Sequence, residues 1–224
     1  MIRIAIDGPG GAGKSSLAKA VAKRLGIIYV DTGALYRTIG VYMLGKGIDP
    51  SDEEKVSANL PDLKLELKFL DGNQVILLNG KAVGEEIRTP EASMAASAVS
   101  ALGSVREFLL MTQRNIAENN SVIMDGRDIG TVILPNADVK IFLTASEECR
   151  AMRRYNELIE RGQSVTYEQV LSEMNERDTQ DSSRKIAPAK PADDAIILDT
   201  TGFEFEDSVN AILEIIKNKC GGSI

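Results

Sequence analysis

The segment IAIDGPGGAGKSSLAKAVAKRLG, residues 4–26, joins an apolar run to a glycine-rich loop and then to an amphipathic stretch. Arg3–Ile6 is a short apolar run closed by Asp7-Gly8, which predicts a buried strand. Lys14–Leu25 repeats apolar residues with a helical period, and it is followed by Gly26, a residue type that commonly ends helices. A strand, a loop and a helix in this order are the beginning of a parallel sheet covered by helices.

The glycine-rich loop matches a phosphate-binding pattern. Residues 8–15 fit G-x-x-x-x-G-K-[ST] between the predicted strand and helix, as the pattern requires. In such a loop, successive backbone N–H groups surround phosphate oxygens. Lys14 is expected at the β- and γ-phosphates and the Ser15 hydroxyl at Mg²⁺. A glycine-rich turn without a ligand is the alternative. We predict a site for a nucleoside triphosphate, ATP, with Mg²⁺, made by Gly8, Pro9, Gly10, Gly11, Ala12, Gly13, Lys14, Ser15 and Ser16.

The rest of the chain repeats the strand and helix pattern on both sides of one different segment. Further strands are predicted over residues 27–30, 121–124, 138–143 and 195–198. Further helices are predicted over residues 32–44, 146–161, 166–179 and 208–217. We therefore predict an α/β fold in which helices flank a parallel core sheet of five strands.

Residues 63–83 interrupt this series. Apolar and charged residues alternate from Leu63 to Phe69, which is the period of a half-buried strand. Asp71-Gly72 and Asn79-Gly80 are pairs typical of hairpin turns. The segment therefore predicts a small antiparallel meander inserted into the α/β series.

Two helices are predicted after the meander. Thr89-Pro90 has the form of an N-cap followed by proline at the first helical position. The helix that it begins is rich in alanine and serine and is broken near Gly103. Ser104 is then predicted to cap the next helix, which runs to about Asn119.

The composition limits the possible functions. The 224 residues are 43% apolar and 26% charged, with a formal net charge of −7. An acidic chain does not favour nucleic-acid binding, and no apolar run reaches the ~20 residues of a membrane span. Because the N-terminus shows no signal-peptide pattern, we expect a cytoplasmic protein. Cys149 and Cys220 are far apart in the chain and are expected to be reduced thiols.

The arginines indicate an anionic ligand. They gather in residues 150–161 and 177–184, and arginine binds phosphate oxygens in pairs while keeping its charge. The chain contains no histidine, the commonest general base. An acceptor that is itself a phosphate is already anionic and needs no deprotonation. These features together favour a small-molecule kinase, because phosphoryl transfer depends on positioning and positive charge.

Two other classes of nucleotide-binding protein share the phosphate loop. A GTPase switch would need an Asn-Lys-x-Asp motif late in the chain, but Asn218-Lys219 is followed by Cys220-Gly221. A motor ATPase usually has a glutamate after its second acidic motif, whereas Gly126 follows Asp125. Asp125 is predicted to bind Mg²⁺ through water, as acidic residues at strand ends in this fold often do, or to cap the turn before Gly126.

Longer motifs identify a family. The motifs are IDGPGGAGKSSLAK (6–19), DTGALYR (31–37), EIRTPEAS (86–93), DGRDIGTVILPNADVKIFLTAS (125–146) and RDTQDSSRKIAPAKPADDAIILDT (177–200). Over nearly the whole chain they resemble the bacterial cytidylate kinases, which are nucleoside monophosphate kinases. The resemblance implies a monomer that transfers the γ-phosphoryl group of MgATP to CMP or dCMP. A P-loop kinase for UMP or a sugar acid, and a nucleotide-dependent switch, are the alternatives.

The resemblance also implies a division of the chain and an acceptor site. The core would span residues 1–60 and 105–224, with a helical lid at about 148–166 and a monophosphate-binding insert at 61–104. Arg37 and Arg127 would hold the acceptor phosphate. Asp128 would accept a hydrogen bond from the cytosine amino group, where uracil offers a carbonyl that the carboxylate rejects. The residues implied to bind CMP are Thr32, Arg37, Ser97, Arg106, Arg127, Asp128, Arg177, Asp181 and Arg184.

Two groups of these residues share a helix face by spacing. Positions 177, 181 and 184 lie on one face if the helix continues that far. Arg150, Arg153 and Arg154 also share a face, which is either a solvated charged surface or part of the site. Given the phosphate loop, we expect at least one of these three to close over the transferred phosphate. The residues predicted to be catalytic are Lys14, Arg127, Arg150, Arg153 and Arg154.

Overall fold

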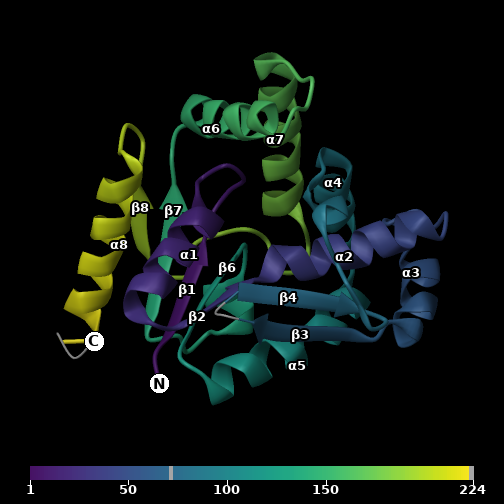
Figure 1. Ribbon diagram of the computed structural model, residues 1–224, viewed down its shortest axis with the longest axis horizontal. Helices are drawn as coiled ribbons and strands as arrows, with labels where there is room; N and C mark the ends of the chain where they lie inside the picture. The colour runs from purple at the N-terminus through teal and green to yellow at the C-terminus, as the bar shows by residue number, and fades with distance from the viewer. Residues whose placement is uncertain (71–72, 222–224) are drawn as a thin grey trace.

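Five parallel strands form the main sheet, in the order β2-β6-β1-β7-β8 (Figure 1). The computed structural model describes residues 1–70 and 73–221. Within them these strands are β1 (Arg3–Asp7), β2 (Ile28–Asp31), β6 (Val122–Gly126), β7 (Val139–Thr144) and β8 (Ile196–Asp199). Each neighbouring pair is parallel, so the carboxyl ends of the five strands lie at one edge of the sheet. The predicted α/β fold with a parallel five-stranded core is confirmed.

Helices cover both faces of this sheet. Ile4 and Ile6 of β1 pack with one pair of helices, whereas Ala5, between them, belongs to the core on the other face. This alternation follows from the two-residue period of a strand. The helices are α1 (Lys14–Leu25) and α8 (Phe205–Lys219) on the first face and α5 (Gly103–Asn119) on the second, which also holds the π-helical turn Ile129–Ile133.

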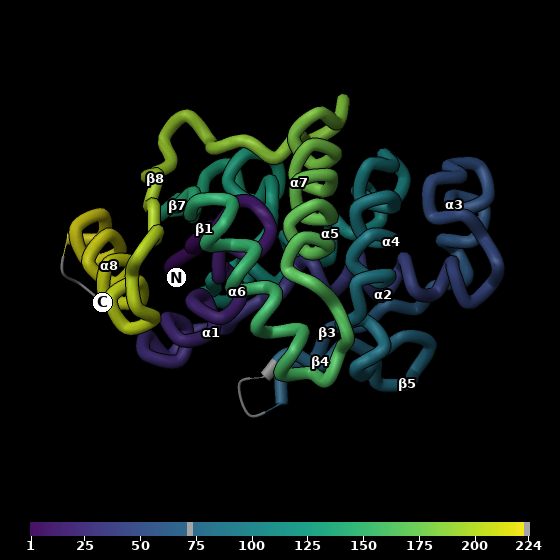
Figure 2. The backbone as a smooth tube through the Cα atoms, turned by 90° about the horizontal axis from the view of Figure 1, so that it is seen from above, coloured from purple at the N-terminus to yellow at the C-terminus, as the bar shows by residue number. Residues whose placement is uncertain are grey.

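A second assembly lies at the end of the molecule opposite α8 (Figures 1 and 2). Its elements are α2 (Thr32–Gly45), α3 (Glu53–Asn59), α4 (Pro90–Ser100) and an antiparallel sheet of β3 (Leu65–Leu70), β4 (Asn73–Leu78) and β5 (Lys81–Ala82). Short 3₁₀ turns at Leu60–Asp62 and Glu85–Arg88 connect them. Leu35 of α2, Ile76 of β4 and Val99 of α4 share one hydrophobic core. The sheet and the helices are therefore packed as one unit beside the main sheet.

The predicted meander is confirmed in its second turn. Asn79 (φ 50°) and Gly80 (φ 81°) both have positive φ, as a two-residue hairpin turn of this type requires. The other predicted turn pair, Asp71-Gly72, lies outside the described residues.

The prediction that Ser104 caps a helix is wrong. A cap at Ser104 would place the first helical residue at position 105, but α5 begins at Gly103, with Leu102 in the N-cap position. Leu102 is buried in the core of the second assembly, so packing decides where the helix begins. Ser104 therefore lies inside the first turn, where its hydroxyl is buried without a hydrogen-bond partner among the described residues.

Two helices project over the carboxyl edge of the main sheet (Figure 1). They are α6 (Glu147–Glu160) and α7 (Tyr167–Ser183), and they pack together. Ser146 caps α6 through a hydrogen bond from the Cys149 N–H, and Thr166 forms a capping box with Gln169. Gly162 (φ 74°) lies between the two helices, at the predicted position. Because the predicted lid, about residues 148–166, falls mostly on α6 and the turn before α7, we call α6 and α7 the lid helices.

Among the described residues, no single helix is long and apolar enough to cross a membrane. The pair α4 and α5, bent by 98°, has the required length and composition only when the two are taken together.

Candidate active site

The loop between β1 and α1 depends on glycine. Gly8 (φ 146°), Gly11 (φ 68°) and Gly13 (φ 88°) all have positive φ. A Cβ atom at Gly8 would lie 2.0 Å from the carbonyl oxygen of Leu143, so this position accepts only glycine. Gly13 precedes α1 without a capping side chain, and the first turn of α1 carries no acidic residue. The N–H groups at the start of α1 are therefore left for an anion.

Lys14 folds back across this loop. Its Nζ donates a hydrogen bond of 2.7 Å to the carbonyl of Pro9, and the residue is 6% exposed. Burial, together with the nearby Arg127 guanidinium, lowers the pKa of Lys14 well below its ordinary value. A bound polyanion would raise the pKa of Lys14 again, because its negative charge favours the protonated ammonium form.

The carboxylate of Asp125 accepts two hydrogen bonds at the edge of the loop. Ser15 Oγ donates to Asp125 Oδ2 at 2.7 Å, and the Tyr29 hydroxyl donates to Asp125 Oδ1 at 2.9 Å. Asp125 stands at the end of β6, opposite Asp31 of β2 in the parallel register. Burial, followed by the charge of Asp31, raises the pKa of Asp125 to about 6. A cation bound here would favour the charged form of Asp125.

A pocket of about 290 Å³ borders the phosphate loop. It brings the loop together with residues from α2, β6, both lid helices and the segment before α4. Its charged lining consists of the cations Lys14, Arg37, Arg88, Arg127, Arg154, Arg161 and Arg177, and of the acids Asp31, Asp125 and Glu157. The pocket is therefore strongly positive, although the whole chain has a net charge of −7.

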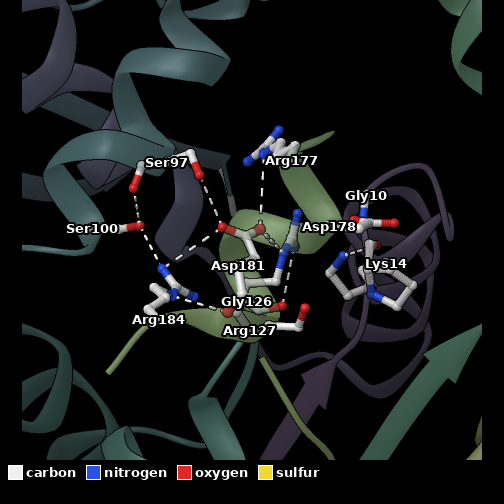
Figure 3. A network of polar contacts seen from close by, with 12 residues as sticks. Gly10, Lys14, Ser97, Ser100, Gly126, Arg127, Arg177, Asp178, Asp181 and Arg184 are labelled. Atoms are coloured by element: carbon white, nitrogen blue, oxygen red, sulfur yellow. Dashed lines mark hydrogen bonds and ion pairs between the residues drawn. The ribbon is translucent and has the colours of Figure 1, made fainter. Parts of the chain in front are cut away.

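Asp181 of α7 connects the arginines behind this pocket (Figure 3). Its carboxylate accepts hydrogen bonds from Arg127 Nε at 2.9 Å and from Ser97 Oγ at 3.0 Å. It also lies 3.9 Å from Arg177 Nε and 3.8 Å from Arg184 Nη1. Burial alone would raise the pKa of Asp181, but the three guanidinium groups hold it below its ordinary value. Three cations share one carboxylate, which leaves this cluster with excess positive charge.

Arg177 and Arg37 each have a buried N–H group without a hydrogen-bond partner among the described residues. Arg177 Nε is buried and makes no hydrogen bond to the described residues, and burial with the neighbouring Arg127 lowers the pKa of Arg177 to about 10. Arg37 donates from Nη2 to Asp31 Oδ2 at 2.8 Å, while its buried Nε also has no partner among the described residues. Both arginines line the pocket. Such guanidinium groups fit phosphate oxygens, which accept several hydrogen bonds.

Asp128 forms a buried ion pair with Arg106. Arg106 also donates from Nη1 to the carbonyl of Ser100 at 2.9 Å, and its Cζ lies 5.8 Å from the centre of the Tyr36 ring. Asp128 and Arg106 are each less than a tenth exposed. The pair combines a hydrogen-bond acceptor with donors in one place, a combination that fits the edge of a nucleobase.

Asp7 links the phosphate loop to the turn that carries Asp128. The Asp7 carboxylate accepts hydrogen bonds of 2.7 Å from the N–H groups of both Ile129 and Gly130. Its burial raises the pKa of Asp7 to about 6. Because Asp7 directly precedes Gly8, one carboxylate fixes the start of the phosphate loop relative to the turn after β6. In the sequence Asp7 marks only the end of the predicted strand, and its contact with the turn was not predicted.

The three predicted lid arginines have different surroundings. Arg150 is buried, and its Nη1 donates to the Gly10 carbonyl at 2.9 Å and to Asp178 at 2.5 Å. Arg153 donates to the Ala12 carbonyl at 3.4 Å and to the Thr200 carbonyl at 2.9 Å. Arg154 forms an ion pair with Glu157 and is the member of the three that lines the pocket.

Comparison with known proteins identifies the family. The family model described as cytidylate kinase matches residues 4–218. The chain belongs to the cytidylate kinase family. The cytidylate kinase of Thermosipho melanesiensis is 51% identical over 97% of this chain and 98% of its own length. That of Caldicellulosiruptor saccharolyticus is 46% identical over 100% of this chain and 99% of its own. Membership of a kinase family implies ATP as the phosphoryl donor, with nucleotides as substrates.

Solved structures with low sequence identity share the fold. An uncharacterized protein from Eubacterium ventriosum aligns with a TM-score of 0.54 and 13% identity, over 97% of this chain and 99% of its own. A shikimate kinase from Acinetobacter baumannii aligns with a TM-score of 0.50 and 15% identity, over 97% of this chain and 94% of its own. These likenesses show the fold alone, which the chain shares with an uncharacterized protein and with a shikimate kinase.

The structure brings part of the predicted acceptor set to the pocket. Arg37, Arg127 and Arg177 line it, whereas Asp128, Arg106, Ser97, Asp181 and Arg184 form the buried network next to it. Thr32 is buried, and its hydroxyl donates to the backbone carbonyl of Asp125 at 2.7 Å. Arg184 lies just beyond the end of α7, so the predicted helical face ends before it.

Sequence reasoning missed several residues of this cytidylate kinase site. Asp178 accepts from the Gly10 N–H at 3.1 Å and binds Arg150, so it joins α7, α6 and the phosphate loop. It directly follows Arg177, and that position in the RDTQD motif was a usable signal. Arg161 lines the pocket from the end of α6. In the sequence its spacing from Glu157 is typical of an ion pair on an exposed helix face, so it gave no sign of a site.

Proposed function

We propose that this protein transfers the γ-phosphoryl group of ATP to the phosphate of CMP or dCMP, giving ADP with CDP or dCDP. The observation that carries the assignment of the two sites is the shared pocket. In about 290 Å³ it joins Lys14 and Ser15 of the phosphate loop to Arg37, Arg127 and Arg177. A donor phosphate chain and an acceptor phosphate in one positively charged cavity are what direct transfer between them requires.

The donor side is formed by the phosphate loop. The N–H groups of the loop and of the first turn of α1 would surround the β- and γ-phosphates. The Lys14 ammonium would exchange its bond to the Pro9 carbonyl for phosphate oxygens. The developing charge on these oxygens is then stabilised by a cation that is already buried in place.

The residues at the loop edge fit Mg²⁺. A hydroxyl and a carboxylate, Ser15 and Asp125, lie 2.7 Å apart, and Mg²⁺ typically takes few protein oxygens together with substrate phosphates and water. No cluster of three or more metal-binding side chains occurs in the described part of the chain, so the ion would depend on the nucleotide. When bound with ATP, Mg²⁺ neutralises phosphate charge. We infer that Ser15 binds it and that Asp125 holds one of its waters.

The acceptor side is formed by the arginines. Arg37 and Arg177 have buried N–H groups that lack partners among the described residues, and Arg127 is fixed between Asp181 and the pocket. These three would hold the CMP phosphate. The cytosine ring would reach the pair of Asp128 and Arg106, where the carboxylate accepts from the N4 amino group. UMP places a carbonyl at that position, so one buried acceptor would face another.

The chemistry needs no general base. An oxygen of the CMP phosphate attacks the γ-phosphorus, and the bond from that phosphorus to the oxygen bridging the β- and γ-phosphates breaks, which releases ADP. The attacking oxygen carries negative charge and no proton that must be removed. Lys14 and the pocket arginines stabilise the charge of the loose transition state. We infer that the lid, about residues 148–166, closes with Arg154 and Arg161 near the donor and limits ATP hydrolysis by excluding water.

The same proposal covers the organisation of the protein. Residues 61–104 would act as the monophosphate-binding insert on a core of residues 1–60 and 105–224. We infer a cytoplasmic monomer that binds neither nucleic acid nor membranes. Size-exclusion chromatography with light scattering tests the oligomeric state, and a dimer mass would contradict it.

An ADP-release assay across acceptors tests the function. ATP and Mg²⁺ are kept constant while CMP, dCMP, UMP, AMP and shikimate are compared at equal concentrations. We expect fast release with CMP or dCMP and at least about 100-fold less with UMP, because a site built around hydrogen bonds rejects such an analogue strongly. ADP release that no acceptor changes would contradict the kinase assignment, and a preference for UMP would contradict the role of Asp128.

A further inference from the structure

Gln74 of β4 makes a bidentate contact with the end of β2. Its Oε1 accepts a hydrogen bond of 2.7 Å from the Asp31 N–H, and its Nε2 donates one of 3.1 Å to the Asp31 carbonyl. β4 belongs to the small antiparallel sheet, and β2 to the main sheet. One side chain therefore connects the two sheets through both backbone groups of a single residue.

The position of β2 explains why this contact can form. β2 is the edge strand of the main sheet and pairs with β6 on one side. A residue of an edge strand whose N–H and C=O groups point outward needs partners there. The side-chain amide of Gln74 offers one acceptor and two donors, so it satisfies both groups in the way that a neighbouring strand would.

Asp31 is also the residue that holds Arg37. Its Oδ1 accepts from the Ala34 N–H at 2.8 Å, which caps α2, and its Oδ2 accepts from Arg37 Nη2 at 2.8 Å. The space around this pair is small, because a Cβ at Gly33 would lie 3.0 Å from Arg37 Nη1 and 3.3 Å from Asp31 Oδ1. Where the Asp31 backbone lies therefore decides where the Arg37 guanidinium lies.

We propose that Gln74 is a positioning residue for acceptor binding: it fixes the Asp31 backbone and, through the Asp31 carboxylate, the guanidinium of Arg37. The inference rests on the proposed function of Arg37 as a ligand of the acceptor phosphate. It also assigns a task to the inserted sheet, which otherwise contributes no side chain to the charged lining of the pocket among the described residues. The sheet sets one of the acceptor arginines from outside the pocket.

The expected effect is selective for the acceptor. Gln74→Met keeps the length of the side chain and removes both hydrogen bonds to Asp31. Without them Arg37 samples other orientations, so we expect the KM for CMP to rise by about tenfold, the equivalent of losing one or two net hydrogen bonds. The KM for ATP should stay within about twofold, since the hydrogen bonds of Gln74 to the described residues go to Asp31 and not to the phosphate loop. Lys81→Ala, on exposed β5 of the same sheet, is the matched control and should change neither KM.

A double-mutant cycle with Arg37→Met tests the route of the effect. If Gln74 acts through Arg37, Gln74→Met adds less than about twofold to the KM for CMP in the Arg37→Met background. Full additivity would overturn the inference, because Gln74 would then act independently of Arg37. An unchanged KM in Gln74→Met, with a raised KM in Arg37→Met, would overturn it and leave the acceptor site in place. Unchanged KM values in both variants would overturn the acceptor role of Arg37 and the inference with it.

A merely structural role is separated by thermal unfolding. Gln74 would only hold the sheets together if Gln74→Met melted far below Lys81→Ala and its kcat/KM values for CMP and for ATP fell equally. We expect instead that both variants melt within a few degrees of each other and that only the KM for CMP responds.

Discussion

In the proposed function the phosphate loop and the acceptor pocket both bind phosphate, but they are built from different groups and different lengths of chain. The loop is one continuous segment, residues 8–16, and it presents backbone N–H groups at the start of α1. The acceptor pocket takes its arginines from α2, the turn after β6 and α7, which are far apart in the sequence. It presents side-chain cations whose charge is partly balanced by Asp31 and Asp181.

This difference has a physical consequence. Only proline lacks a backbone N–H group, so other substitutions weaken the donor loop mainly through sterics at glycine and through Lys14. The acceptor pocket stores its charge in ion pairs, and removal of one member leaves another buried charge without its partner. The two sites should therefore fail separately, and each of the following changes tests that separation.

The largest effect is expected for Lys14→Met. This change removes the buried cation that would reach the transferred phosphoryl group, while the methionine fills the same space. Loss of one such electrostatic contact typically lowers kcat by about 10²- to 10³-fold. The KM for CMP should change by less than about threefold, because Arg37, Arg127 and Arg177 remain. Steady-state kinetics with both substrates varied measure this, and a large rise in the KM for CMP would show that the two sites are not separate.

Asp128→Asn should act on the acceptor side alone. The amide keeps the size of the carboxylate but loses the charge that pairs with Arg106 and accepts from the cytosine amino group. We expect kcat/KM for CMP to fall by about 30- to 100-fold, because a good base contact is worth ~1–3 kcal/mol of discrimination. The preference for CMP over UMP should narrow, and the KM for ATP should not move. Equal falls in kcat/KM for CMP and for ATP would instead place Asp128 at the metal or at the donor nucleotide.

Asp125→Asn should stabilise the nucleotide-free protein. The pKa of Asp125 is about 6 in the folded state against 3.8 ordinarily, so the folded protein binds an extra proton between about pH 4 and pH 6. Its stability consequently falls as the pH rises through this window, and above about pH 6 the ionised carboxylate destabilises the folded state. We expect the variant to melt roughly 5 °C higher than the unsubstituted protein at pH 7.5, with the difference gone at pH 4.

Calorimetry at the two pH values, without nucleotide, checks this result. MgATP should reverse the order, because a bound cation stabilises the carboxylate and not the amide. A variant that melts lower than the unsubstituted protein at pH 7.5 would mean that the hydrogen bonds from Ser15 and Tyr29 outweigh the buried charge.

The smallest effect is expected for Thr32→Ser. The Thr32 hydroxyl donates to the Asp125 carbonyl, and serine can make the same bond. Only a buried methyl group is lost, which lowers the free energy of unfolding by about 1 kcal/mol. The KM for CMP should change by less than about twofold. A much larger rise would show that the Thr32 methyl group, and not the shared hydroxyl alone, supports acceptor binding.

The same comparison explains what the sequence could and could not reveal. The phosphate loop is local: a strand, a glycine pattern and a helix follow one another, so its geometry could be predicted from spacing. The acceptor residues are brought together by packing, and only the motifs of a known family pointed to Arg127 and Asp128. The contact between Gln74 and Asp31 left no signal, because it joins a polar position of an inserted strand to a backbone.

The start of α5 was predicted wrongly for a related reason. Serine after glycine predicted a cap at Ser104, but burial of Leu102 in the second core places the start of α5 earlier. The lid arginines show the limit of spacing arguments. Arg150 and Arg154 share a helix face, yet the first is buried against the Gly10 carbonyl and the second borders the pocket. Periodicity predicts which residues share a helix face, but tertiary packing determines which groups each side chain contacts.

Calorimetric titration of each nucleotide into two variants tests whether the donor and acceptor sites are separate. MgATP and CMP are titrated separately into Lys14→Met and Arg127→Ala, with thermal unfolding to confirm that both are folded. Asp181 keeps Arg177 and Arg184 as neighbours in Arg127→Ala, so its charge stays paired. We expect a crossed result: Lys14→Met loses at least about tenfold affinity for ATP but binds CMP normally, and Arg127→Ala loses affinity for CMP but binds ATP normally. Equal losses of affinity for both nucleotides in either folded variant would contradict separate donor and acceptor sites.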